Sequence, residues 1–167
     1  MRICIIVLVL ILIGCKSPKK EYDFTFYKGN IHESYFLNFN SSDTLYFTDV
    51  YGYDKEETSF TILSKEEKEK IDAILDTITF SKMDSFQNNK IEDGTTNAFV
   101  LRKGKQTRKL KIHGGKGPSA FWIFGKTLEK IKLNHKFNKT NKKIDLKEIN
   151  EMVLMKVPPS FVFDTLQ

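Results

Sequence analysis

The sequence predicts one α+β domain, with an antiparallel sheet of two hairpin or meander units and two to three helices packed on one face. Its length of 167 residues fits a single domain. Aromatic and β-branched segments separated by polar turns occur in two stretches, and each stretch is followed by apolar residues at helical spacing. With 14 Phe and 6 Tyr, the chain has ample apolar area for one core. Strands that precede helices in blocks favour α+β over α/β.

The first strands are expected from residue 35. Segments 35–39 and 44–51 are rich in aromatic and aliphatic residues, and the polar turn 40–43 joins them, which is typical of a hairpin. A second polar turn at 54–57 leads to a third strand over 58–63. These strands should form an antiparallel meander.

A helix over 65–79 should follow. Ser64 and Glu67 have the spacing of a capping box, and apolar residues recur on one helical face at Ile71, Ile74, Leu75 and Ile78. The next strands, 97–102 and 107–113, flank a short turn at Gly104, so they predict a second hairpin.

Two more helices are expected towards the C-terminus. Pro118 suits a helix start, and the apolar spacing predicts a helix over 119–133 from Phe121, Phe124, Leu128 and Ile131. Asp145 and Glu148 form another capping-box pattern before a third, shorter helix that ends ahead of Pro158. Residues 161–163 are expected to add an edge strand or cover the core.

The first fifteen residues predict export. After Arg2, residues 3–14 form an apolar run that is shorter than the ~20 residues of a spanning helix, and the charged Lys16 follows soon after. The sequence Leu12-Ile13-Gly14-Cys15 resembles the lipobox of bacterial lipoproteins, in which an aliphatic residue and two smaller residues precede an invariant Cys. Ile13 is bulkier than the usual residue at its position.

This resemblance implies cleavage of a signal peptide at 1–14 and a diacylglyceryl thioether on Cys15, usually with an acyl chain such as palmitate on the new amino terminus. Several chains together give near-permanent attachment. Residues 15–30 would then be the lipidated Cys and a tether, and 31–167 the domain. Lys16 replaces the aspartate that retains enteric lipoproteins at the inner membrane, so the outer membrane is favoured, with its face left open. The order of elements also loosely resembles small single-domain lipoproteins of Gram-negative bacteria, which implies no activity.

Cysteine and histidine content restricts the chemistry. The sequence encodes two cysteines. Cys4 would leave with the leader and Cys15 would be modified, so the mature protein would have no free thiol for a disulfide or a nucleophile. The three histidines, His32, His113 and His135, are scattered, so we expect no metal site and no cofactor.

Charge separates along the chain and suggests an anion site. Residues 40–95 carry thirteen acidic and six basic residues, whereas 96–167 carry sixteen basic and five acidic. Lys109 and Lys111 share one strand face, and Lys116 and Ser119 lie beside the turn Gly114–Gly117 before a helix, which makes these four side chains candidate anion ligands. The alternatives are a solvated sheet face and a tight strand-to-helix connection. We expect no nucleic acid partner, because no recognition motif is present.

For catalysis, Asp49 or Asp93 could act with His113, since a carboxylate can orient an imidazole for acid/base work, and the candidate pair is Asp93 and His113. Asp93 also belongs to a turn dipeptide with Gly94, and no serine lies in a nucleophile elbow. The leading hypothesis is therefore a lipid-anchored, non-enzymatic binding or accessory module of the cell envelope, with the membrane and an envelope protein or anionic ligand as partners. One alternative is an envelope hydrolase in which Asp93 and His113 share a pocket. Another is a periplasmic inhibitor or immunity protein. The oligomeric state stays open.

Overall fold

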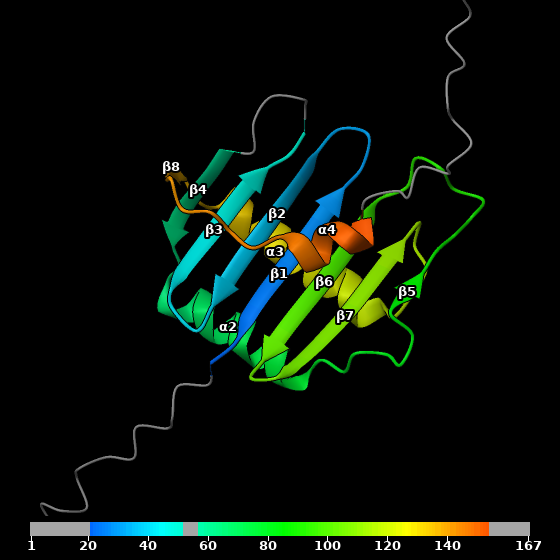
Figure 1. The fold of residues 1–167 in the computed structure, drawn as a ribbon, viewed down its shortest axis with the longest axis horizontal. Coiled ribbons are helices and arrows are strands. Elements are labelled where there is room, and N and C mark those ends of the chain that lie inside the picture. Colours follow the sequence, from blue (N-terminus) through cyan, green and yellow to red (C-terminus); the bar gives the residue numbers. More distant parts are fainter. Residues whose placement is uncertain (1–20, 52–56, 154–167) are drawn as a thin grey trace, which may run out of the picture.

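The computed structural model describes residues 21–51 and 57–153, which form an α+β fold with a mostly antiparallel sheet (Figure 1). The strands have the sheet order β5-β7-β6-β1-β2-β3-β4-β8, and β5 pairs in parallel with β7. Their bounds are β1 Asp23–Gly29, β2 Ser34–Asn40, β3 Thr44–Asp49, β4 Glu57–Ile62, β5 Ser85–Phe86, β6 Thr96–Lys103, β7 Gln106–His113 and β8 Asn138–Lys139. The helices are α2 Lys65–Thr77, α3 Ser119–Leu133 and α4 Lys147–Val153.

Strand β1 corrects the expected boundary between tether and domain. Residues 15–30 are the tether expected from the sequence, but 23–29 form a central strand that pairs with both β2 and β6. Phe24 and Phe26 have no exposed surface, because both rings point into the main core. The segment 161–163 lies outside the described residues.

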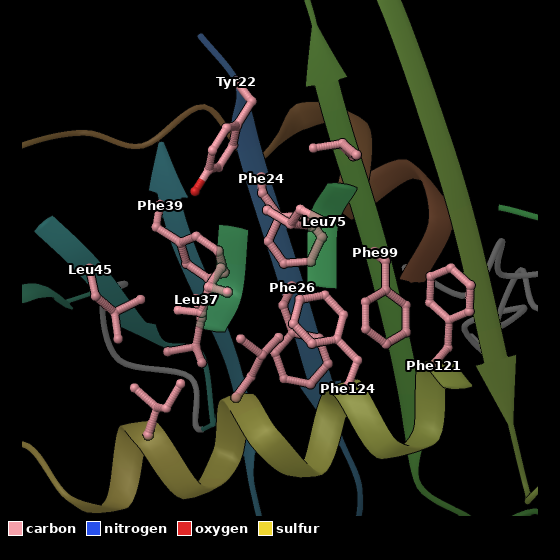
Figure 2. Close-up of a cluster of buried hydrophobic side chains, with 14 of the residues drawn as sticks. Tyr22, Phe24, Phe26, Leu37, Phe39, Leu45, Leu75, Phe99, Phe121 and Phe124 are labelled. Carbon is pink, nitrogen blue, oxygen red and sulfur yellow. The ribbon is translucent and has the colours of Figure 1, made fainter. Parts of the chain in front are cut away.

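Helices α2 and α3 cover one face of the sheet and enclose the main core. Ser64 caps α2 as predicted, with its side chain accepting from the Glu67 amide and the Glu67 carboxylate accepting from the Ser64 amide. Figure 2 shows the centre of this core, where Phe99 of β6 lies among rings from β1 and α3. The ring centroid of Phe99 is 5.2 Å from that of Phe26 and 5.0 Å from that of Phe121.

Helix α4 lies on the opposite face, so the prediction of helices on one face holds for α2 and α3 only (Figure 1). Its Ile149, with Leu146 just before it, packs on Phe36, Ala98 and Val100, which alternate with the residues of the main core. Arg102 fastens this helix to the sheet. Its guanidinium contacts three carboxylates, those of Asp23 at 3.1 Å, Asp145 at 3.3 Å and Glu148 at 3.4 Å.

The strand register defines two ends of the sheet. At the entry end, where the described chain begins, Asp23 lies between Asn40 and Arg102, so the 40–43 and 103–106 turns flank it. At the opposite end Gly29 lies between Ser34 and Thr96, and the 87–94 loop leads into β6 at this end. Within the described residues no helix combines the length and apolar character needed to cross a bilayer.

Candidate functional site

A cavity of about 760 Å³ opens at the end of the sheet opposite the entry end. Four stretches distant in sequence form it: the end of β1 with the β1–β2 turn, the 87–94 loop with the start of β6, the end of β7, and the end of α4. Its floor is sheet, from Tyr27, Thr96, Lys111 and His113, on the α4 face. A volume of this size falls within the range of small-molecule sites, ~300–1,000 Å³.

The β1 wall depends on a glycine. The Tyr27 ring packs over Gly29, and a Cβ added to Gly29 would lie 2.1 Å from the Tyr27 hydroxyl oxygen. Ser34 Oγ lies 3.1 Å from that hydroxyl, and the Phe36 ring lies 5.1 Å from the Tyr27 ring, centroid to centroid. Tyr27 is therefore held as a fixed wall of the cavity.

His113 links the sheet to the 87–94 loop through hydrogen bonds of both its ring nitrogens. Its Nε2 lies 2.8 Å from the carbonyl oxygen of Ile91, which only accepts, so Nε2 donates this bond. Its Nδ1 lies 2.8 Å from the hydroxyl of Thr96 and, in the neutral ring, accepts from it. Both ring nitrogens are therefore occupied by the protein, and neither is left for proton transfer to a substrate.

The structure brings Asp93 and His113 to one cavity, as the hydrolase alternative requires, but does not join them. Asp93 is exposed at the rim, and no hydrogen bond links the two side chains in the part of the chain that the structure describes. The carbonyl of Ile91 holds the ring nitrogen that a carboxylate would need in order to orient the imidazole. The arrangement therefore favours a structural role for His113.

The four candidate anion ligands occupy different places. Lys111 lies on the cavity floor. Lys109 lies on the same face of β7 as Lys111, but the Lys109 ammonium lies 3.8 Å from the carboxylate of Glu148 in α4. Lys116 and Ser119 are exposed in and after the turn that leads into α3, and neither lines the cavity.

The glycine-rich turn before α3 has a packing explanation. Gly114, Gly115 and Gly117 have positive φ, and a Cβ on Gly117 would lie 2.5 Å from Cγ2 of Ile112. The Lys116 amide donates to the His113 carbonyl, and the Trp122 indole donates to the Lys116 carbonyl at 2.9 Å. The turn is thus a close connection between β7 and α3.

Several cavity residues were not singled out from the sequence: Tyr27, Asn30, Ile31, Asn88, Asn89, Ile91 and Glu92. The Asn-rich loop that supplies several of them has the composition of an ordinary connection. Asn88 shows why it has a defined shape, since its side chain accepts from the Lys90 amide and donates to the Gly114 carbonyl at 3.3 Å. An Asn at a loop position that must satisfy neighbouring backbone groups was the available signal.

Among residues 21–51 and 57–153, no group of three or more His, Cys, Asp and Glu side chains is arranged to hold a metal ion. No protein-family model matches the sequence, and no curated protein matches it. The case for function therefore rests on the geometry of this chain.

Proposed function

We propose that this protein is a lipid-anchored, non-enzymatic binding module of the bacterial cell envelope, attached through Cys15 and binding a soluble partner in the cavity at the far end of β1. One observation supports it above the others. The domain begins only a few residues after Cys15, and the cavity opens at the other end of the strand with which the domain begins.

The start of the domain is fixed to α2 by a buried polar cluster. The Tyr22 hydroxyl donates to Asp72 and accepts from Nζ of Lys68 at 2.7 Å, and Lys68 also pairs with Asp72. Burial, followed by the hydrogen bond to Asp72, raises the pKa of Tyr22, so its hydroxyl stays protonated. Lys68 is only 7% exposed. The chain therefore has a defined point at which a tether ends.

The distances favour presentation of the cavity away from the bilayer. Six residues separate Cys15 from Tyr22, a stretch that reaches at most about 25 Å when fully extended. Strand β1 has seven residues and spans about 20 Å. Because the tether joins the domain at its entry end, the attachment favours an orientation in which that end lies nearer the membrane than the cavity does.

Binding fits this cavity better than hydrolysis. His113 has both ring nitrogens in bonds that shape the loop, and Asp93 is exposed at the rim without a bond to it. The outer membrane is the proposed location, because Lys16 follows Cys15 where retained lipoproteins carry an aspartate.

Replacement of the lipobox cysteine tests attachment. In a Gram-negative host, we expect the wild-type protein to incorporate labelled palmitate and to fractionate with the outer membrane. The Cys15→Ser variant should incorporate no label and leave the outer-membrane fraction, because it lacks the sulfur that forms the thioether. The matched control is Cys4→Ser, which alters the leader cysteine and should behave as wild type. Unlabelled wild-type protein, or a Cys15→Ser variant that stays in the outer-membrane fraction, would contradict the anchor.

A further inference from the structure

We propose that the cavity binds a short zwitterionic peptide, with the ligand's carboxylate on Lys111 and its ammonium group at Glu92 and Asp93. This inference rests on the proposed binding function and specifies its ligand class. It follows from a half-buried lysine without a carboxylate partner, from two carboxylates at the rim of the same cavity, and from two exposed apolar side chains in its lining.

Lys111 lacks the partner that comparable cations have. Within the described ranges, every other buried or half-buried lysine or arginine has a carboxylate within ion-pair distance: Lys28, Lys68, Arg102, Lys103, Lys109 and Lys132. Lys111 is half-buried on the cavity floor, and its ammonium has no carboxylate partner among those residues. A half-buried positive charge without a counter-ion favours an anionic group from a ligand.

The rim carries the opposite charge. Glu92 and Asp93 are exposed on the 87–94 loop and line the cavity, and no ion pair engages either within the described residues. The bond from His113 to the Ile91 carbonyl holds this loop over the sheet. The cavity therefore places a cation at its floor and two anions at its mouth.

This polarity selects against ligands of a single charge sign. A polyanion would bring negative charge past Glu92 and Asp93, and a polycation would bring positive charge onto Lys111, so each meets repulsion. A ligand with a carboxylate at one end and an ammonium group at the other satisfies both regions. An unblocked short peptide has this chemistry at any sequence.

The rest of the lining suits a peptide of small residues. Ile31 and Ile91 are 56% and 42% exposed and both line the cavity, so they offer apolar surface to the small side chains of a peptide. Asn89 and Gln87, also exposed in the loop, supply amide donors and acceptors for a peptide backbone. The volume of about 760 Å³ accommodates a few residues.

A titration with three related peptides tests the inference on the full lipidated protein in detergent micelles. The probes are trialanine, N-acetyl-trialanine, which has no ammonium group, and trialanine amide, which has no carboxylate. Amide chemical shifts in ¹H–¹⁵N NMR spectra report affinity and location together. We expect trialanine to shift the amides of Gly94 and Thr96, and each blocked peptide to bind about tenfold more weakly, since each lacks one charge-assisted contact.

Two charge variants complete the test. Lys111→Met should weaken trialanine binding about tenfold and leave the affinity for trialanine amide unchanged, because the amide has no carboxylate for Lys111 to bind. The control, Lys116→Met, removes the same charge from an exposed position outside the cavity and should leave both affinities unchanged. Equal binding of all three peptides, shifts outside the cavity, or no binding of trialanine would overturn the inference. None of these outcomes bears on attachment through Cys15, which the labelling experiment tests separately.

Discussion

Replacement of Phe99 by alanine is expected to lower the free energy of unfolding by about 4 kcal/mol, the largest loss from any single change considered for this chain. Phe99 has no exposed surface. Its ring contacts β1 through Phe26 at 5.2 Å and α3 through Phe121 at 5.0 Å and Phe124 at 6.1 Å, between centroids. The alanine variant would leave a cavity where the β6–β7 hairpin, β1 and α3 meet. Urea denaturation of the purified protein measures the loss.

Two further variants test whether the loss of stability comes from the buried volume of the Phe99 ring. Phe99→Leu should recover more than half of the loss, because leucine refills most of the volume but not the aromatic contacts. Ile123→Ala removes an apolar side chain that is 65% exposed on α3, and should change stability by less than about 0.5 kcal/mol. A loss below about 1.5 kcal/mol for Phe99→Ala would show that this ring is not the centre of the core.

Replacement of Lys28 by methionine is expected to cost about 2 kcal/mol, since it leaves carboxylates without their main partner. The Lys28 ammonium pairs with Glu129 of α3 and lies 2.7 Å from Glu33, which also pairs with Lys132 at 3.5 Å. The Lys28 side chain is 12% exposed, whereas Glu33 and Glu129 are 33% and 31% exposed, and water reduces the cost accordingly. Lys126→Met, at an exposed position of α3, is the matched control and should be nearly neutral.

This cluster also predicts a pH dependence. Burial opposes both charged forms, but the bonds and charges exchanged within the cluster outweigh it, so the pKa of Glu33 is lowered and the pKa of Lys28 is raised. The stabilisation from Glu33 is therefore complete above its ordinary pKa of 4.5 and is lost as the pH falls through the lowered value. That from Lys28 is complete below 10.5 and is lost above its raised value.

Denaturation series across pH measure this effect. The wild-type protein should lose stability from the cluster below pH 4.5 and keep it up to about pH 10.5. The acid step should shrink in Lys28→Met, because Lys132 alone then remains to hold the charged form of Glu33. An unchanged acid step in Lys28→Met, together with a loss no greater than that of Lys126→Met, would refute the role assigned to the cluster.

Local patterns were enough to predict most elements. The capping box at Ser64 and Glu67 predicted the start of α2, and helical spacing predicted α3 over 119–133 with the bounds that the structure has. Strand β1 was missed because its apolar residues, Phe24 and Phe26, lie only a few residues after the basic stretch 16–20, and the whole segment has the polar character of a tether. Tertiary pairing on both sides, with β2 and β6, is what makes this short segment a central strand.

Helical periodicity could not predict the sheet face on which α4 packs. It shows that a helix has a buried side, but not which face of the sheet that side covers. A signal did exist in the strands. Residues 35–39 and 97–101 are buried without interruption, and such runs are typical of a sheet covered on both faces. The continuous apolar run from Ala98 to Leu101 therefore indicated a second covering layer.

The candidate site depends on contacts that sequence spacing does not contain. Asp93, Lys111 and His113 do share a cavity, but the roles of the two basic side chains depend on their neighbours. His113 is occupied because Thr96 and the Ile91 carbonyl lie against its ring, and Lys111 is distinctive because similar cations have acidic partners. Four separate stretches of the chain converge on the cavity, and only the fold brings them together.

The central claim, that an anchored domain presents its cavity away from the membrane, is tested most directly by site-specific quenching. With Cys15 lipidated and the leader removed, as proposed, the chain would carry no other cysteine. A fluorophore can then be placed at one introduced cysteine, either Lys105→Cys in the turn at the entry end or Ile91→Cys at the cavity. In vesicles with nitroxide-labelled headgroups, we predict stronger quenching at position 105 than at position 91. Equal quenching, or stronger quenching at position 91, would contradict the account.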